Sequence, residues 1–189
     1  MLHKDNHTAP WCKEPQPGNA EHGDMAREVY RRAENAGCEI VLPDQFVVAK
    51  EFKEGAEART VEPDDVPDDC MILDIGPRAA SEIVAKLATC KTIVWNGPMG
   101  AFEVPPFDAG TNQVAQAIGK LCQQGDLLAV AGGGDTVSAL VHAGAADQFS
   151  YLSTAGGAFL EWLEGKELPG VAALEKSAAP EIRNQVAQA

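Results

Sequence analysis

The sequence predicts an α/β protein in which a Rossmann-like, mainly parallel sheet carries helices on both faces, giving three layers. Two observations support this prediction. From residue 71 onward, short apolar clusters alternate with longer stretches of helical periodicity. Glycine, proline and small polar residues follow each apolar cluster, as they do where the strands of βαβ units end. The crossover connections of such units are right-handed, and their helices cover the faces of the sheet.

The chain begins with a polar stretch that has neither helical nor strand periodicity. Residues 1–23 are rich in proline and histidine, so we expect a loosely ordered arm there. A helix is predicted next, because apolar residues recur on one face at Met25, Val29 and Ala33. Asp24 is placed to cap its start, and Gly37 is placed to end it.

Two strands are predicted after this helix, at residues 38–42 and 46–49, with Pro43 and Asp44 between them. Residues 51–69 are acidic and are interrupted by two prolines. We expect that stretch to be a surface excursion with at most one short strand.

The repeating part of the chain supplies the remaining elements. Its predicted strands are residues 71–75, 92–95, 127–131 and 151–152. Its predicted helices are residues 79–88, 111–123, 136–143 and 157–164. The folded part is therefore expected over residues 24–175, with residues 176–189 as a tail.

Charge and composition limit the partners. The chain has 15 Lys and Arg against 28 Asp and Glu, a formal net charge of -13, so nucleic acid and anionic membranes are poor partners. No apolar run approaches the ~18 residues that cross a bilayer, and the start does not resemble a signal peptide. The five cysteines are widely spaced and odd in number, which suggests reduced thiols. These features predict a cytoplasmic location.

The loop after the strand at residues 127–131 reads Gly132-Gly133-Gly134-Asp135-Thr136 and leads into a helix. Its glycines allow the backbone to approach a phosphate, and the helix N-terminus favours an anion there. Asp135 would repel that phosphate unless a hard cation such as Mg²⁺ lies between them, which suggests a metal role. The alternative, that Asp135 only caps the helix, has about equal weight.

Two further loops follow predicted strands. Residues 153–158 form a second small-residue turn, which either meets a ligand or simply allows close packing of helix on sheet. In residues 96–103, Asn96 offers an amide, and Glu103 is either an acceptor for ribose hydroxyls or a solvated charge. His142 is the only histidine of the folded part, which disfavours a Ser-His-Asp site and favours phosphoryl transfer.

Four segments together resemble the phosphoglycerate kinase family in order and spacing. They are Leu73-Asp74-Ile75-Gly76-Pro77, residues 94–103, residues 132–136, and residues 153–161 with the Leu163-Glu164-Gly165-Lys166 and Leu168-Pro169-Gly170-Val171 that follow. The resemblance covers about residues 24–175 and implies an incomplete C-terminal, nucleotide-binding domain. It implies reversible phosphoryl transfer between 1,3-bisphosphoglycerate and MgADP, which gives 3-phosphoglycerate and MgATP in glycolysis.

The resemblance also implies roles for individual residues. Asn96 and Gly97 would line the nucleotide cleft, Glu103 would bind the ribose, Gly133 and Gly134 the phosphates, Asp135 the magnesium ion and Thr136 a phosphate oxygen. In the turn Ala155-Gly156-Gly157, the two glycines would be catalytic, because they would point a helix N-terminus at the transferring phosphoryl group.

The sequence departs from the family pattern in two ways. Ala155 replaces the first of three glycines, and Phe159 stands where a small hydroxyl residue is frequent. The family's N-terminal domain, which binds 3-phosphoglycerate, and the lysine-bearing start of its nucleotide domain have no counterpart here. We therefore expect no kinase turnover from the isolated chain. The alternative is a non-catalytic magnesium-nucleotide-binding module or a truncated remnant.

Overall fold

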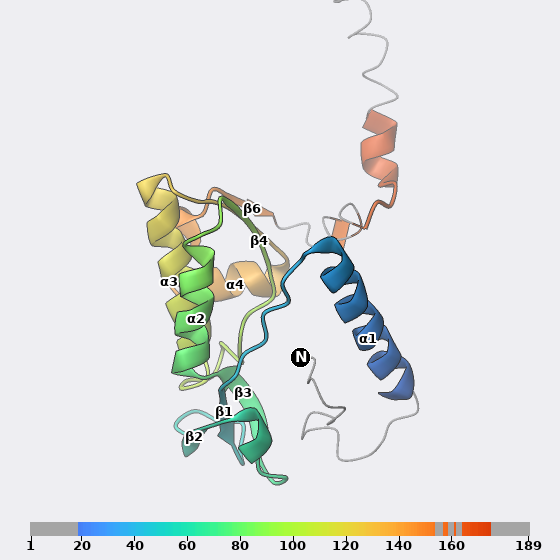
Figure 1. The fold of residues 1–189 in the computed structure, drawn as a ribbon. Coiled ribbons are helices and arrows are strands. Elements are labelled where there is room, and N and C mark those ends of the chain that lie inside the picture. The colour runs from blue at the N-terminus through green and yellow to red at the C-terminus, as the bar shows by residue number, and fades with distance from the viewer. Residues whose placement is uncertain (1–18, 154–156, 159–160, 162–163, 175–189) are drawn as a thin grey trace, which may run out of the picture.

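The computed structural model describes residues 19–153, 157–158, 161 and 164–174 of the chain, and it contains two three-stranded sheets (Figure 1). The strands are β1 (Phe46–Ala49), β2 (Ala58–Val61), β3 (Met71–Ile75), β4 (Thr92–Asn96), β5 (Leu128–Gly132) and β6 (Tyr151–Ser153). The helices are α1 (Asn19–Ala36), α2 (Pro77–Leu87), α3 (Ala109–Gln124) and α4 (Gly134–His142), with short 3-10 turns η1 (Pro63–Asp65) and η2 (Ala146–Gln148).

The predicted α/β class and parallel sheet are confirmed by the second sheet. Its order is β4-β5-β6, and both neighbouring pairs are parallel. The helices α3 and α4 connect these strands and both contact β5. Trp95, Ala129 and Ala131 point to this covered side and are at most 5% exposed. The core of the molecule lies here, between the sheet and its helices.

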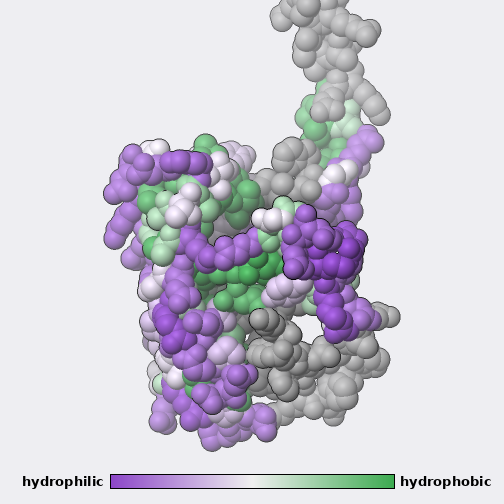
Figure 2. Space-filling view, in the orientation of Figure 1, coloured by the Kyte–Doolittle hydropathy of each residue, from purple (hydrophilic) through white to green (hydrophobic). Residues whose placement is uncertain are grey.

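The opposite face of this sheet is open in the described part of the chain, so the expected helices are present on one face only. Side chains alternate between the two faces of a strand, and the residues that alternate with the buried set are Val94, Leu128 and Tyr151, which are 48%, 53% and 61% exposed. Figure 2 shows a hydrophobic area between β4 and α1 on the side facing the viewer.

The first sheet differs from the prediction, because β3 does not join the parallel sheet. Its order is β2-β1-β3, and both pairs are antiparallel. The register places Val47 opposite Asp74 and shifts between Val47 and Val48. A five-residue apolar run specifies a strand without specifying its partner, and here the partner is the strand that follows Gln45. The expected single short strand within residues 51–69 is β2.

The start of α1 and the segment after it also correct the prediction. The helix begins at Asn19, so residues 19–23 are helical and Asp24 lies inside the helix, where its carboxylate pairs with Arg27. No proline interrupts residues 19–24, so nothing forces the helix to begin at Asp24. The helix does end at Gly37, whose φ is 64°. Residues 38–42 form no strand.

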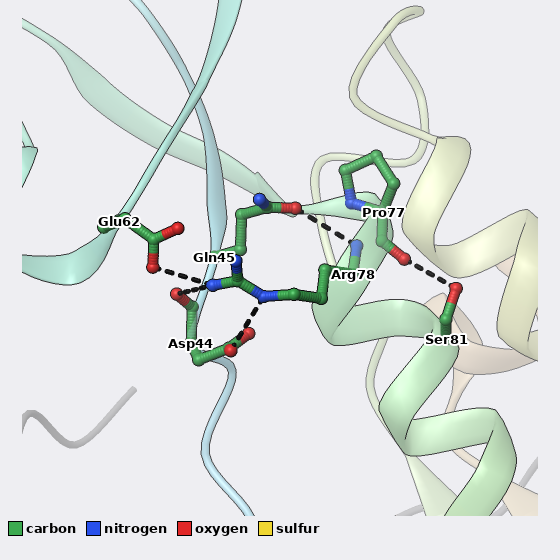
Figure 3. Close-up of polar contacts among 6 residues, drawn as sticks. All are labelled: Asp44, Gln45, Glu62, Pro77, Arg78 and Ser81. Atoms are coloured by element: carbon green, nitrogen blue, oxygen red, sulfur yellow. Dashed lines mark hydrogen bonds and ion pairs between the residues drawn. The ribbon is translucent and has the colours of Figure 1, made fainter.

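Arg78 joins the antiparallel sheet to the start of α2 (Figure 3). Its Nε donates to Asp44 Oδ2 at 2.9 Å, and its Nη2 donates to Glu62 Oε2 at 2.7 Å. These hydrogen bonds, to Glu62 first and then to Asp44, hold the pKa of the guanidinium above its usual range. The backbone N–H of Arg78 donates to Gln45 Oε1 at 3.1 Å, and that of Gly76 donates to Gln45 O at 2.7 Å. These bonds therefore hold the segment before β1 and the end of β2 against the β3–α2 turn.

No helix among the described residues is long and apolar enough to cross a membrane. The described cysteines are free: Cys70 is buried, Cys90 and Cys122 are partly covered, and Cys38 is exposed.

Candidate functional site

The carboxyl ends of the three parallel strands form a single row. Asn96 at the end of β4 pairs in register with Gly132 at the end of β5, which pairs with Ser153 at the end of β6. Ligands of open α/β sheets bind outside this edge, because the loops that leave the strands gather there. Three predicted loops therefore start side by side.

Gly133 makes the turn from β5 into α4. Its φ of 102° lies where residues with a side chain are strained, and its N–H donates to Ser153 O at 3.2 Å. A Cβ atom on Gly133 would sit 3.3 Å from Asn96 Oδ1 and 3.4 Å from Thr136 Oγ1. The glycine thus leaves room for a close approach of these two polar side chains, which come from different loops.

Thr136 ties the loop after β4 to the first turn of α4. The N–H of Gly97 donates to Thr136 Oγ1 at 2.7 Å, and the indole N–H of Trp95 donates to the carbonyl of Gly97. Thr136 is 2% exposed. Its oxygen accepts this bond with one lone pair, so its hydroxyl hydrogen is free to donate to an acceptor such as a phosphate oxygen.

Asp135 lies in the first turn of α4, exposed beside the equally exposed Gly134. A Cβ added to Gly134 would meet nothing within 4 Å, so the space in front of this helix end is open. Among the described residues, no group of three or more His, Cys, Asp or Glu side chains gathers to hold a metal. One carboxylate fits a Mg²⁺ ion that arrives with phosphate oxygens as its other ligands.

Glu103 lies away from this cluster. Its neighbour Phe102 is buried, with its ring 6.3 Å from the ring of His142 at the last residue of α4. Asp135 is near the first residue of that helix, and a nine-residue helix is roughly 12 Å long from first to last Cα. Glu103 and Asp135 therefore belong to opposite ends of α4. His142 itself pairs with Asp108, Nε2 to Oδ2 at 3.1 Å.

The second glycine turn is only partly within the described residues. Gly156 lies outside them, as do Ala155 and Phe159. Gly157 is described, is exposed and begins a helical segment, with nothing within 4 Å of the position of its Cβ. Its catalytic role stays a prediction.

Sequence reasoning missed the residues that hold the loop after β4. The backbone N–H groups of Met99 and Gly100 donate to Thr111 Oγ1 at 3.1 and 3.3 Å. The N–H of Ala101 donates to Leu73 O at 2.8 Å. Asp74, 2% exposed, lies beside them. The available signal is a carboxylate within the apolar run Met71–Ile75.

The parallel strands, the row at their carboxyl ends and the glycine turn into α4 define an α/β protein with the ligand-site geometry of open parallel sheets. The chain belongs to the phosphoglycerate kinase family: a family model described as phosphoglycerate kinase matches residues 12–166.

Relatives and solved structures agree with this membership. The chain is 62% identical over 153 residues to phosphoglycerate kinase of Xanthobacter autotrophicus, and 59% identical over 151 residues to that of Cereibacter sphaeroides. These matches cover 81% and 80% of the chain, and 39% and 38% of the relatives, so the chain spans about two fifths of their length. The structure of phosphoglycerate kinase from Coxiella burnetii matches with a TM-score of 0.74 and 41% identity, covering 80% of this chain and 38% of that one. The enzyme from Pyrococcus horikoshii matches with a TM-score of 0.64 and 28% identity, covering 84% and 36%.

Proposed function

We propose that this chain supplies part of the nucleotide site of a phosphoglycerate kinase, the glycolytic enzyme that moves a phosphoryl group reversibly between 1,3-bisphosphoglycerate and MgADP. The row formed by Asn96, Gly132 and Ser153 at the carboxyl edge, with the N-terminus of α4 opening from it, is the observation that supports the proposal. Backbone N–H groups at a helix start favour an anion such as a nucleotide phosphate.

Each predicted nucleotide-binding residue has a part in this proposal. The N–H of Gly134 is at the helix start where phosphates would bind, and Thr136 offers its hydroxyl hydrogen. Gly133, whose own N–H donates to Ser153 O, would let the phosphates approach the backbone of the turn. Asp135 would hold Mg²⁺ that arrives with the nucleotide, and the ion would neutralise phosphate charge. Asn96 and Gly97 would line the nucleotide cleft. Glu103, near the other end of α4, would accept ribose hydroxyls.

The isolated chain is proposed to bind MgADP without catalysing transfer. Asp135 is the one charged side chain among the residues that this part of the structure gathers at the carboxyl edge, and it is negative. Phosphoryl transfer depends on positive charge placed around the transferring group. The 3-phosphoglycerate site and the remaining phosphate ligands would come from the part of the enzyme that the relatives have beyond this match, and the protein would act in the cytoplasm.

Calorimetric titration of the purified chain with ADP, with and without Mg²⁺, tests the proposal. We expect Mg²⁺-dependent binding that Asp135→Ala weakens by roughly tenfold or more, because a direct charge-assisted metal contact is lost. Asp147→Ala, an exposed carboxylate in η2, is the matched control and should bind as the wild type does. A folded chain that binds no ADP, or equal effects of both substitutions, would contradict the proposed site.

Turnover is measured separately, with 3-phosphoglycerate and MgATP. We expect none above background from the chain alone. Turnover at ordinary enzyme rates, roughly 1–100 s⁻¹ for kinases, would show that the chain is a complete catalyst.

A further inference from the structure

We propose that Asp74 is a positioning residue for the candidate nucleotide site. Its carboxylate caps the N-terminus of α3, from which it is distant in sequence, and it holds the loop that leads from Asn96 to Glu103. The inference rests on the proposed function, because that function gives the loop its ligand. Asp74 itself contacts no nucleotide in this proposal.

The carboxylate of Asp74, on strand β3 of the antiparallel sheet, acts as the N-cap of α3. Its Oδ2 accepts the N–H of Gly110, in the first turn of α3, at 2.7 Å, and its Oδ1 accepts the N–H of Ile75 at 2.8 Å. Asp108, the residue immediately before α3, makes no capping hydrogen bond with its side chain. Its Oδ2 instead accepts from Asn112 Nδ2 at 2.8 Å and lies 3.1 Å from His142 Nε2. The first turn of α3 therefore depends on a residue 36 positions earlier in the chain.

Two glycines enclose this carboxylate. A Cβ on Gly110 would lie 2.6 Å from Asp74 Oδ1, and a Cβ on Gly100 would overlap the same oxygen. Gly100 belongs to the loop, so the loop backbone packs directly against the carboxylate. The adjacent amides complete the attachment: Ala101 N–H donates to Leu73 O at 2.8 Å, and Met99 N–H donates to Thr111 Oγ1 at 3.1 Å.

The loop is thus held at both of its ends. At one end Gly97 is bonded to Thr136, and at the other Phe102 packs against His142. Asp74 lies between these two attachments, on the strand side of the loop. Loss of its charge would release Gly110 and loosen the support under Gly100, which would shift Asn96 and Glu103 relative to each other.

The surroundings of Asp74 make its ionisation sensitive to pH. Burial raises its pKa to about 6, against the lowering effect of the N–H groups of Gly110 and Ile75, and the nearby Asp108 also raises it. The elements packed against it, namely β1, residues 98–101 and residues 109–112, carry no ionisable side chain. Asp108 is the charged neighbour, and it is paired with His142. A proton on the carboxylate would turn one acceptor into a donor that faces an N–H group.

Asp74→Asn tests the proposal, because it removes the charge and one acceptor at nearly constant volume. We expect hydrogen exchange at the amides of Ala101 and Gly110 to accelerate by roughly tenfold or more. MgADP affinity should fall by roughly threefold to tenfold, the range expected for a residue that acts through others. Asp126→Asn, exposed just beyond the other end of α3, is the matched control and should change neither.

The pH dependence supplies a second readout, because loss of the Asp74 charge should perturb the two amides and also lower MgADP affinity. In the wild type, the amide resonances of Ala101 and Gly110 should shift together with a midpoint near 6, and MgADP affinity should fall below that pH. In Asp74→Asn, the transition of the amides should be absent, and MgADP affinity should fall less than in the wild type, leaving only the part due to protonation of the nucleotide phosphate. This titration of the wild type needs no variant, so it holds even if Asp74→Asn fails to fold.

The outcomes separate the two proposals. If Asp74→Asn folds and exchanges at wild-type rates, or if the two wild-type resonances do not titrate together, Asp74 does not position the loop. If the wild-type chain binds no MgADP while both amides respond to Asp74, the proposed function fails and the clamp on the loop stands as a structural feature alone.

Discussion

The two sheets of this protein differ in how much of their surface is covered. The buried apolar clusters of the antiparallel sheet are smaller than the main core, yet they lie on both of its faces. Phe46 and Val48 pack with Cys70 on one face, and Ala49 packs with Phe107 on the other. In the described part of the chain, the main core covers one face of the parallel sheet, and the other face is exposed. Apolar content alone therefore does not tell which strand surfaces are interior.

The difference also separates two tasks. Leu73 and Asp74, on strand β3 of the antiparallel sheet, hold the loop that follows β4 of the parallel sheet. The parallel sheet ends in the row of strand termini where a ligand would bind. Substitutions in the two regions should thus affect stability and binding to different degrees.

The largest expected effect is in the cover of the antiparallel sheet. Phe107 is fully buried, so Phe107→Ala should lower the free energy of unfolding by about 3–5 kcal/mol, measured by urea denaturation. Phe52, whose ring is 6.4 Å away and which is 53% exposed, is the control, and Phe52→Ala should cost much less. Equal losses would mean that Phe107 is no more deeply buried than Phe52 in solution.

The next effect concerns the charge of Asp74. Its pKa is raised from 3.8 to about 6, so the folded state binds more protons than the unfolded state between these pH values. The contribution of Asp74 to stability therefore falls as pH rises through this window, by about 3 kcal/mol at most, since one pKa unit corresponds to ~1.36 kcal/mol. Urea denaturation from pH 4 to pH 7 should show the stability of the wild type falling relative to Asp74→Asn. A constant or rising difference would contradict a raised pKa.

A smaller effect is expected at the junction of sheet and helix. Arg78→Met keeps the aliphatic stem and removes the bonds to Asp44 and Glu62, so it should lower the thermal midpoint at low salt. Since these groups are exposed, the difference from wild type should shrink in 1 M salt, where the screening length falls to about 3 Å. Lys53→Met, which removes an exposed pair with Glu51, should change the midpoint less. A difference that does not respond to salt would argue for packing rather than charge.

The smallest effect is expected on the open face of the parallel sheet. Leu128 is 53% exposed, so Leu128→Thr should change the free energy of unfolding by no more than about 0.5 kcal/mol. The preceding residue is a direct control, because Leu127 is 5% exposed and Leu127→Thr should cost about 2 kcal/mol or more. Similar losses at the two positions would show that the face is covered in solution.

The sequence predicted strands and helices well where periodicity is local. The bounds of β3 are those expected, β4 and β6 extend one residue beyond the expected end, and β5 is shifted by one residue at both ends. Pairing was harder to predict, because the partner of β3 is chosen by contacts such as Gly76 to Gln45, which are distant in sequence. Residues 38–42 have strand composition, but no partner strand among the described residues satisfies their backbone.

The candidate site shows the same limit. Short motifs identified Asn96, Gly97, Gly133 and Thr136, and the structure brings these residues together. The bond between Gly97 and Thr136 could not be predicted, because it joins loops 39 residues apart. Asp74 was missed as a supporting residue for a related reason: a charge in an apolar strand signals a buried partner without saying which helix holds it.

The bond from the Trp95 indole to the Gly97 carbonyl has an optical consequence. The ring is 5% exposed, and its N–H is committed to the same loop residue that Thr136 holds. Tryptophan emission responds to the polarity and hydrogen bonding around the indole, so Trp95 is a built-in fluorophore for this loop. With Trp11 and Trp162 replaced by phenylalanine, the wavelength of the remaining emission would report whether the indole of Trp95 keeps its bond to Gly97.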